Sequence, residues 1–150
     1  MMHQSVEAVL RTKASDEIVS IEASATVAEA VATMAVRRVG AVLIMNEDKL
    51  VSGIFTERDL LVRVVHAGLA PATTPISLVM TRDVRFVTPG TTVEAALSLM
   101  HLNRHRHLLV IDGPKVYGLL SIGDLVRQMI ERGEGRFEAA VREELNAAKG

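Results

Sequence analysis

Residues 53–60 read Gly-Ile-Phe-Thr-Glu-Arg-Asp-Leu, and residues 118–125 read Gly-Leu-Leu-Ser-Ile-Gly-Asp-Leu. Each segment begins as an apolar strand with a glycine and continues into a pattern typical of a helix. In both, a hydroxyl residue stands three positions before an aspartate. The recurrence indicates a duplicated strand-to-helix junction, so the chain contains an internal repeat.

The similarity continues upstream of the two junctions. The short apolar runs at 41–45 and 107–111 predict buried strands, and each is followed by turn residues. Lead-in strands are expected at 18–21 and 84–87.

A helix is predicted between the first and second strand of each half. Apolar residues recur there at helical spacing, and a threonine stands three residues before a glutamate, as Thr26/Glu29 and Thr91/Glu94. This is the capping-box pattern, which satisfies free amides at a helix start. Further helices are expected at 6–10, 60–66, 76–80 and 125–131.

Each half therefore reads strand, helix, strand, strand, helix, so the fold class is α/β in the broad sense (α+β). We expect a first repeat at 5–66, a linker at 67–75, a second repeat at 76–132 and an amphipathic helix within 133–150. Because a half of about 60 residues would be marginally stable alone, the two pseudo-symmetric repeats are predicted to pack sheet to sheet as one module.

Composition excludes several classes of protein. Among 150 residues, 49% are hydrophobic and 23% are charged, which argues against general disorder. A net charge of −1 gives no electrostatic reason to expect nucleic-acid binding. The absence of cysteine excludes disulfides and thiol catalysis. With no membrane-length apolar run and no signal-peptide pattern, a cytoplasmic protein without a membrane partner is expected.

The duplicated junction has two compatible interpretations. Thr56 with Asp59, and Ser121 with Asp124, can simply cap a helix N-terminus. A strand that leads into a helix start also presents free amides that suit phosphate. A carboxylate one turn later can accept two hydrogen bonds from a ribose diol. The pattern alone leaves both roles open.

Residues 103–107 read Asn-Arg-His-Arg-His and enter a predicted strand. They form a cationic cluster that suits a solvated loop, an anion contact or, least supported, a DNA contact. His105 and His107 share a strand face, but no cysteine or adjacent carboxylate completes a metal site, so no metal is expected. No nucleophile motif or Gly-rich phosphate loop is present, so the chain is predicted not to be an enzyme, and a small hydrolase using this cluster is the weakest hypothesis.

These motifs together resemble a tandem pair of CBS domains, the Bateman module, over about residues 5–132. The resemblance is greatest with small stand-alone bacterial proteins of this family. It implies a non-catalytic regulatory module that binds an adenine nucleotide (AMP, ADP or ATP, with NAD possible) in clefts between the repeats. It also implies a homodimer formed through the helices, with signalling to an effector protein by a change of conformation or assembly.

The resemblance implies roles for residues at matching positions. The aspartates hold the ribose, and the Thr or Ser lies near phosphate. One cleft is expected to use Leu119, Ser121, Asp124, Arg106 and His107, with Val19, Val39 and Gly40 against the base. The other cleft is expected to use Ile54, Thr56, Arg58 and Asp59, with Arg85, His105 and Arg106 from the other half.

One departure from symmetry affects phosphate binding in the second of these clefts. The first half has Gly40 and Ala41 where the second half has Arg106 and His107, so the Asp59 cleft is expected to bind phosphate less tightly or to use Arg58 and Arg37/Arg38. The alternative function is a structural dimerisation or interaction module that binds no nucleotide.

Overall fold

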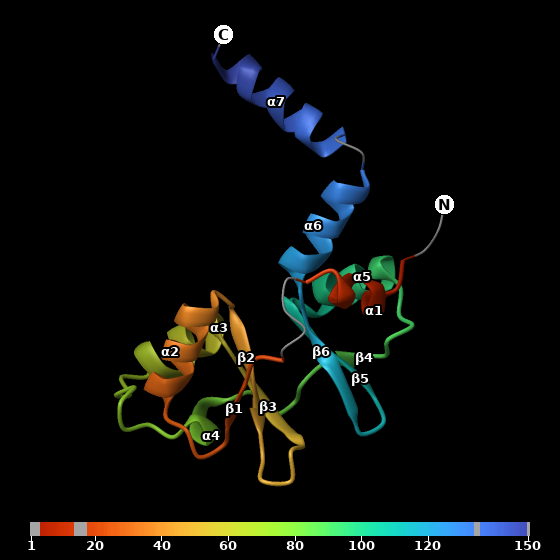
Figure 1. Ribbon diagram of the computed structural model, residues 1–150. Coiled ribbons are helices and arrows are strands. Elements are labelled where there is room, and N and C mark those ends of the chain that lie inside the picture. The colour runs from red at the N-terminus through yellow and green to blue at the C-terminus, as the bar shows by residue number, and fades with distance from the viewer. Residues whose placement is uncertain (1–3, 14–17, 134–135, 150) are drawn as a thin grey trace.

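The computed structural model describes residues 4–13, 18–133 and 136–149 (Figure 1). The first half contains a three-stranded sheet in the order β1-β2-β3, with β1 at Ser20–Glu22, β2 at Ala41–Met45 and β3 at Val51–Thr56. β1 runs parallel to β2, and β2 runs antiparallel to β3. The connection from β1 to β2 is α2 (Val27–Arg37).

The second half repeats this topology. Its sheet has the order β4-β5-β6, with β4 at Phe86–Val87, β5 at His107–Asp112 and β6 at Lys115–Ser121. The parallel pair β4–β5 is joined through α5 (Val93–Asn103), and β5 and β6 are antiparallel. The predicted fold class, a mixed α and β fold of two matching repeats, is confirmed.

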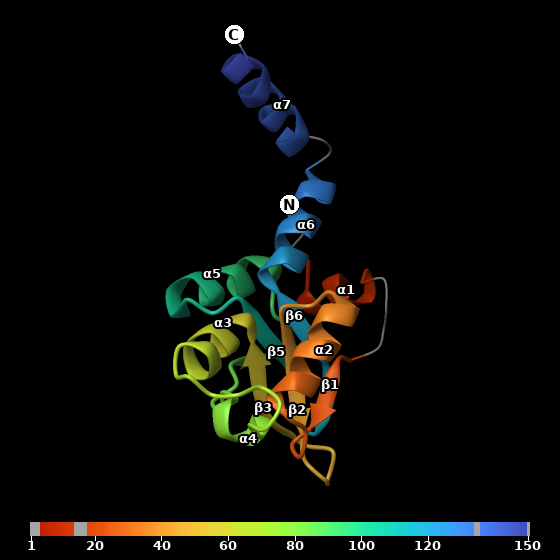
Figure 2. The ribbon, with the colours of Figure 1, turned by 90° about the vertical axis from the view of Figure 1, so that its left-hand side faces the viewer.

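The two junctions begin helices of different kinds. In the first half, α3 (Glu57–Asp59) runs directly into η1 (Leu60–Val65), a π-helical stretch. In the second half, α6 (Ile122–Arg132) is a regular α-helix. The C-terminal helix α7 (Arg136–Lys149) extends away from the body of the molecule in both views (Figures 1 and 2).

One predicted helix cap is wrong by one residue. Thr26 forms the capping box with Glu29 as expected, with N–H to oxygen distances of 3.2 and 3.1 Å. In the second half the cap is Thr92, whose hydroxyl accepts the Ala95 N–H at 3.1 Å. The neighbouring Thr91 instead uses its carbonyl to accept the Val6 N–H at 2.8 Å. The helix therefore begins one residue later than predicted, and Thr91 precedes its N-cap, where it pairs with the N-terminal segment.

The halves exchange their short leading helices. α1 (Val6–Arg11) precedes the first half in sequence, but its Val6 and Val9 are buried in the core of the second half. α4 (Ile76–Val79) precedes the second sheet, but its buried residues belong to the core of the first half. Each core thus depends on a helix from the segment leading into the other half. This exchange of helices holds the two halves together.

No helix among the described residues is both long enough and apolar enough to span a membrane.

Candidate functional site

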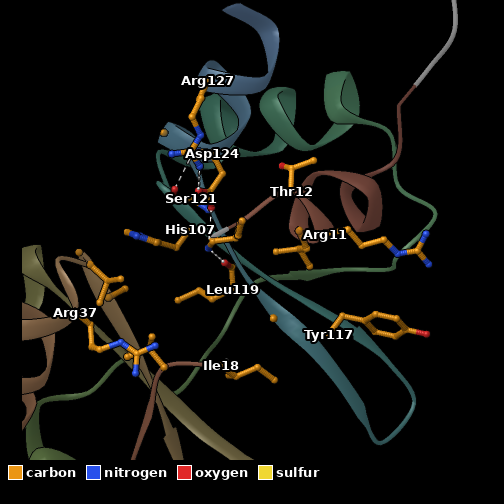
Figure 3. A pocket seen from close by; sticks show the side chains of 18 of the residues that line it. Arg11, Thr12, Ile18, Arg37, His107, Tyr117, Leu119, Ser121, Asp124 and Arg127 are labelled. Atoms are coloured by element: carbon orange, nitrogen blue, oxygen red, sulfur yellow. Dashed lines mark hydrogen bonds and ion pairs between the residues drawn. The ribbon is translucent and has the colours of Figure 1, made fainter. Parts of the chain in front are cut away.

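The two halves enclose a cleft of about 1070 Å³ beside the start of α6. One wall comes from β5, β6 and the first turn of α6. The opposite wall comes from the segment before β1 and from the end of α2 with the start of β2. Figure 3 shows Arg37 and Ile18 across the cleft from Ser121, Asp124 and His107.

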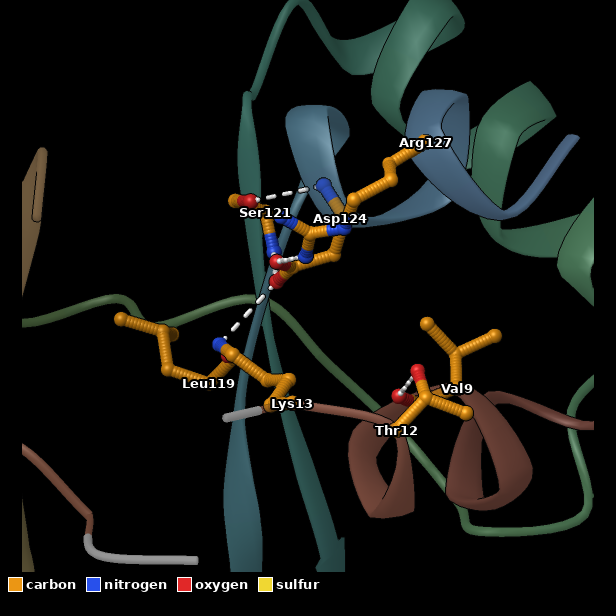
Figure 4. A network of polar contacts seen from close by, with 7 residues as sticks. All are labelled: Val9, Thr12, Lys13, Leu119, Ser121, Asp124 and Arg127. Carbon is orange, nitrogen blue, oxygen red and sulfur yellow. Dashed lines mark hydrogen bonds and ion pairs between the residues drawn. The ribbon is translucent and has the colours of Figure 1, made fainter. Parts of the chain in front are cut away.

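Asp124 lies at the centre of a polar network on the second-half wall (Figure 4). Its Oδ2 accepts the Ser121 N–H at 2.9 Å, while the Ser121 hydroxyl accepts the Asp124 N–H at 3.0 Å. Lys13 Nζ lies 3.1 Å from Oδ2 and also donates to the Leu119 carbonyl at 3.1 Å. Arg127 donates to Oδ1 at 2.9 Å. The junction is therefore a helix cap whose carboxylate also pairs with two cations.

The surroundings fix the charge states of two groups in the cleft. Burial raises the pKa of Asp124, but the Ser121 amide and the Lys13 ammonium more than offset this, so its pKa is lowered overall. Burial lowers the pKa of His107, and the nearby Asp124 and Glu57 carboxylates offset only part of that effect. At neutral pH Asp124 is ionised and His107 is neutral.

Basic side chains predominate around the cleft, because six lysines and arginines line it against three carboxylates. The basic residues are Arg11, Lys13, Arg37, Arg38, Lys115 and Arg127, and the acidic ones are Glu7, Asp124 and Glu131. A cleft with such an excess attracts an anionic ligand. Within it, Asp124 supplies an acceptor for paired hydroxyls, so the site combines the features that suit a phosphorylated sugar.

Half of the predicted site residues line this cleft. They are Val19, Val39, Gly40, His107, Leu119, Ser121 and Asp124. Arg106, which was predicted for the same cleft, is not among its lining residues. The Arg106 side chain is exposed, and its carbonyl accepts the Ile122 N–H at 2.8 Å.

The Asp59 junction is arranged differently. Asp59 accepts hydrogen bonds from the Thr56 N–H at 3.0 Å and from the Thr81 hydroxyl at 3.0 Å. Thr81 is itself fixed by two backbone hydrogen bonds to Ile54, at 2.8 and 2.9 Å. Arg63 Nε lies 3.6 Å from the carboxylate. This aspartate is 7% exposed and does not line the large cleft.

The remaining residues predicted for the Asp59 site are spread over a wider area. Arg58 is an exposed side chain on α3. Arg85 lines a smaller cleft of about 200 Å³ and lies 3.6 Å from Asp83. His105 follows the end of α5, where its N–H donates to the Met100 carbonyl at 3.1 Å.

Sequence reasoning missed four residues that contact the two aspartates. Arg127 stands three positions after Asp124 and Arg63 stands four positions after Asp59, and these helical spacings could have predicted both pairs. Lys13 and Thr81 lie on segments far from their partners in sequence, and no spacing rule connects them. They reach the junctions only because α1 and α4 pack on the opposite halves.

Comparison with known proteins agrees with this architecture. The family model described as "CBS domain" matches residues 6–66 and 76–131. The CBS-domain protein CBSCBSPB2 of Arabidopsis thaliana is 40% identical over 119 residues, which are 79% of this chain and 22% of that protein. The chain therefore spans about a fifth of the length of that relative.

Comparison with solved structures also finds CBS-domain proteins. A CBS-domain protein of Burkholderia ambifaria MC40-6 superimposes with a TM-score of 0.81 at 35% identity, covering 85% of this chain and 95% of that one. PAE2072 of Pyrobaculum aerophilum, a CBS-domain protein in complex with AMP, gives 0.71 at 26% identity, covering 81% and 89%. The chain belongs to the CBS-domain family and carries two CBS domains in tandem, the Bateman module. Proteins of this family are generally regulatory modules without catalysis of their own.

Proposed function

We propose that this chain is a non-catalytic regulatory module that binds an adenine nucleotide in the cleft beside Asp124. AMP, ADP and ATP are the expected ligands, and NAD is a further candidate. The proposal rests mainly on one observation: the Ser121–Asp124 capping box faces a basic cleft of about 1070 Å³ between the repeats. The AMP complex of the related Pyrobaculum protein supports the choice of ligand.

Each part of an adenine nucleotide has a counterpart in this cleft. The Asp124 carboxylate suits the ribose diol, and Ser121 with the first amides of α6 suits phosphate. Val19, Val39 and Leu119 supply apolar surface for the base. In this proposal the Asp59 junction is a structural cap, because Asp59 does not line the large cleft and its carboxylate accepts a hydrogen bond from Thr81.

Titration calorimetry with AMP, ATP and NAD tests the proposal. We expect one nucleotide per chain, and Asp124→Asn should lower its affinity at least tenfold because the carboxylate's charge-assisted hydrogen bonds are lost. Asp59→Asn is the matched control, since it makes the same change in the same motif and should leave the affinity unchanged. Absence of binding by all three nucleotides, or equal effects of the two variants, contradicts the proposal.

We further propose that the module acts as a homodimer and signals to an effector protein through a change of conformation or assembly. Apolar side chains are exposed on η1 and α6, which follow the two junctions. They are Leu61, Val62 and Val65 on η1, and Ile122, Val126, Met129 and Ile130 on α6. An exposed apolar surface of this kind is typical of an interface.

The same surface favours the second candidate function, a structural dimerisation module that binds no nucleotide. Light scattering on Val65→Glu and Val126→Glu should show a loss of the dimer if these faces form it. A dimer that persists in both variants contradicts the assignment of the interface. A dimer without any nucleotide binding favours the second candidate function.

A further inference from the structure

Lys13 occupies the carboxylate that a ribose diol would use and a backbone carbonyl beside it. Its ammonium lies 3.1 Å from Asp124 Oδ2 and 3.1 Å from the carbonyl oxygen of Leu119. Asp124 is the group that suits a ribose diol, and Leu119 lines the cleft beside it. The same lysine therefore covers both the carboxylate and the adjacent strand edge, and an entering nucleoside must displace it.

Displacing Lys13 has a different cost for neutral and phosphorylated ligands. The Asp124 side chain is 8% exposed, so its carboxylate is poorly solvated and depends on its counter-charges. A neutral nucleoside supplies hydroxyl hydrogen bonds to Asp124 but nothing for the released ammonium. A phosphate brings a new anion into the cleft, and the long, flexible lysine side chain can transfer to it. Only the phosphorylated ligand replaces the ion pair that it breaks.

We propose, on the basis of the nucleotide-binding function above, that Lys13 determines specificity by acting as a latch that admits phosphorylated nucleosides and disfavours neutral ones. In the empty cleft the latch is closed on Asp124 and Leu119. In the occupied cleft Lys13 contacts phosphate, on the side where His107 and Ser121 line the wall. Lys13 thus links the end of α1 directly to the occupancy of the site.

Arg127 also pairs with Asp124, but it is not placed to act as a latch. It belongs to the same helix as Asp124 and approaches the other carboxylate oxygen, Oδ1, at 2.9 Å. Among the described residues it makes no hydrogen bond to Leu119, and its side chain is 57% exposed. Arg127→Met therefore removes one cation from the same carboxylate without uncovering the strand edge, which makes it a matched control.

The experiment measures the affinities of AMP and of adenosine by calorimetry at one fixed pH and salt concentration. In Lys13→Met the competitor for Asp124 is gone, so adenosine should bind on the order of tenfold more tightly. AMP loses a phosphate contact at the same time, so its affinity should stay level or fall. The preference for AMP over adenosine should therefore fall at least about tenfold.

Two further variants complete the test. Lys13→Arg keeps the charge and should keep most of the preference for AMP, while Arg127→Met should reduce that preference clearly less than Lys13→Met does. If Lys13→Met changes AMP and adenosine affinities equally, or weakens adenosine binding, the latch is refuted while nucleotide binding stands. If the wild-type protein binds neither ligand, the proposed function itself fails and the latch fails with it.

Discussion

Shortening a single side chain in α1 should destabilise the second half of the molecule, which is distant from α1 in sequence. Val9 is 1% exposed and packs in the core formed by Val93, Met100, Leu120 and Leu125. Val9→Ala removes two buried carbon groups at about 0.8 kcal/mol each and leaves a small cavity. We therefore expect the free energy of unfolding to fall by about 2–3 kcal/mol.

Urea denaturation measures that loss, and amide chemical shifts locate it. For Val9→Ala the shift changes should concentrate in residues 93–125, not in the adjacent first sheet. Val79→Ala is the matched control, because Val79 in α4 is 3% exposed and packs in the core of the first half. Its shift changes should concentrate in residues 27–64. Perturbations that remain in the half adjacent in sequence for both variants would refute the exchange of helices.

Further substitutions test three other features of the structure. Gly53→Ala should destabilise the fold by about 1–3 kcal/mol in urea, because a Cβ there would lie 2.7 Å from the Thr81 carbonyl oxygen. Gly90→Ala, with nothing within 4 Å, should be nearly neutral. Thr81→Val should cost about 1–2 kcal/mol by removing a hydrogen bond to the buried Asp59, with AMP affinity unchanged. Burial lowers the pKa of His107 from 6.5 in the folded protein. As the pH drops below 6.5, the imidazole of the unfolded chain is therefore protonated before that of the folded chain, and the free energy of unfolding should fall. His107→Gln should flatten the plot of unfolding free energy against pH below 6.5. An unchanged slope contradicts the assignment of this pH dependence to His107.

The sequence predicted the local features of the fold because each depends on neighbouring residues. The glycine-bearing strands, the apolar runs and the hydroxyl-x-x-aspartate junctions repeat at nearly the same spacing, so they predicted the repeat and the order of strands and helices along each half. Both junction caps form as their spacing implies, since a capping box needs only residues three positions apart. The cap predicted at Thr91 was wrong by one residue, since the N-cap is Thr92. The backbone there pairs with Gln4 and Val6, and this contact lies outside any local pattern.

The chain's own pattern therefore established two matching halves, each with an acidic residue at the start of a helix. Folding alone decided that those two aspartates have different surroundings. The exchange of α1 and α4 brings Lys13 to Asp124 and Thr81 to Asp59. One partner is a flexible ammonium beside an open cleft, and the other is a hydroxyl held by backbone bonds. Residues this far apart in sequence meet only when apolar side chains from each leading helix are buried in the opposite core, and short-range spacing carries no information about that choice.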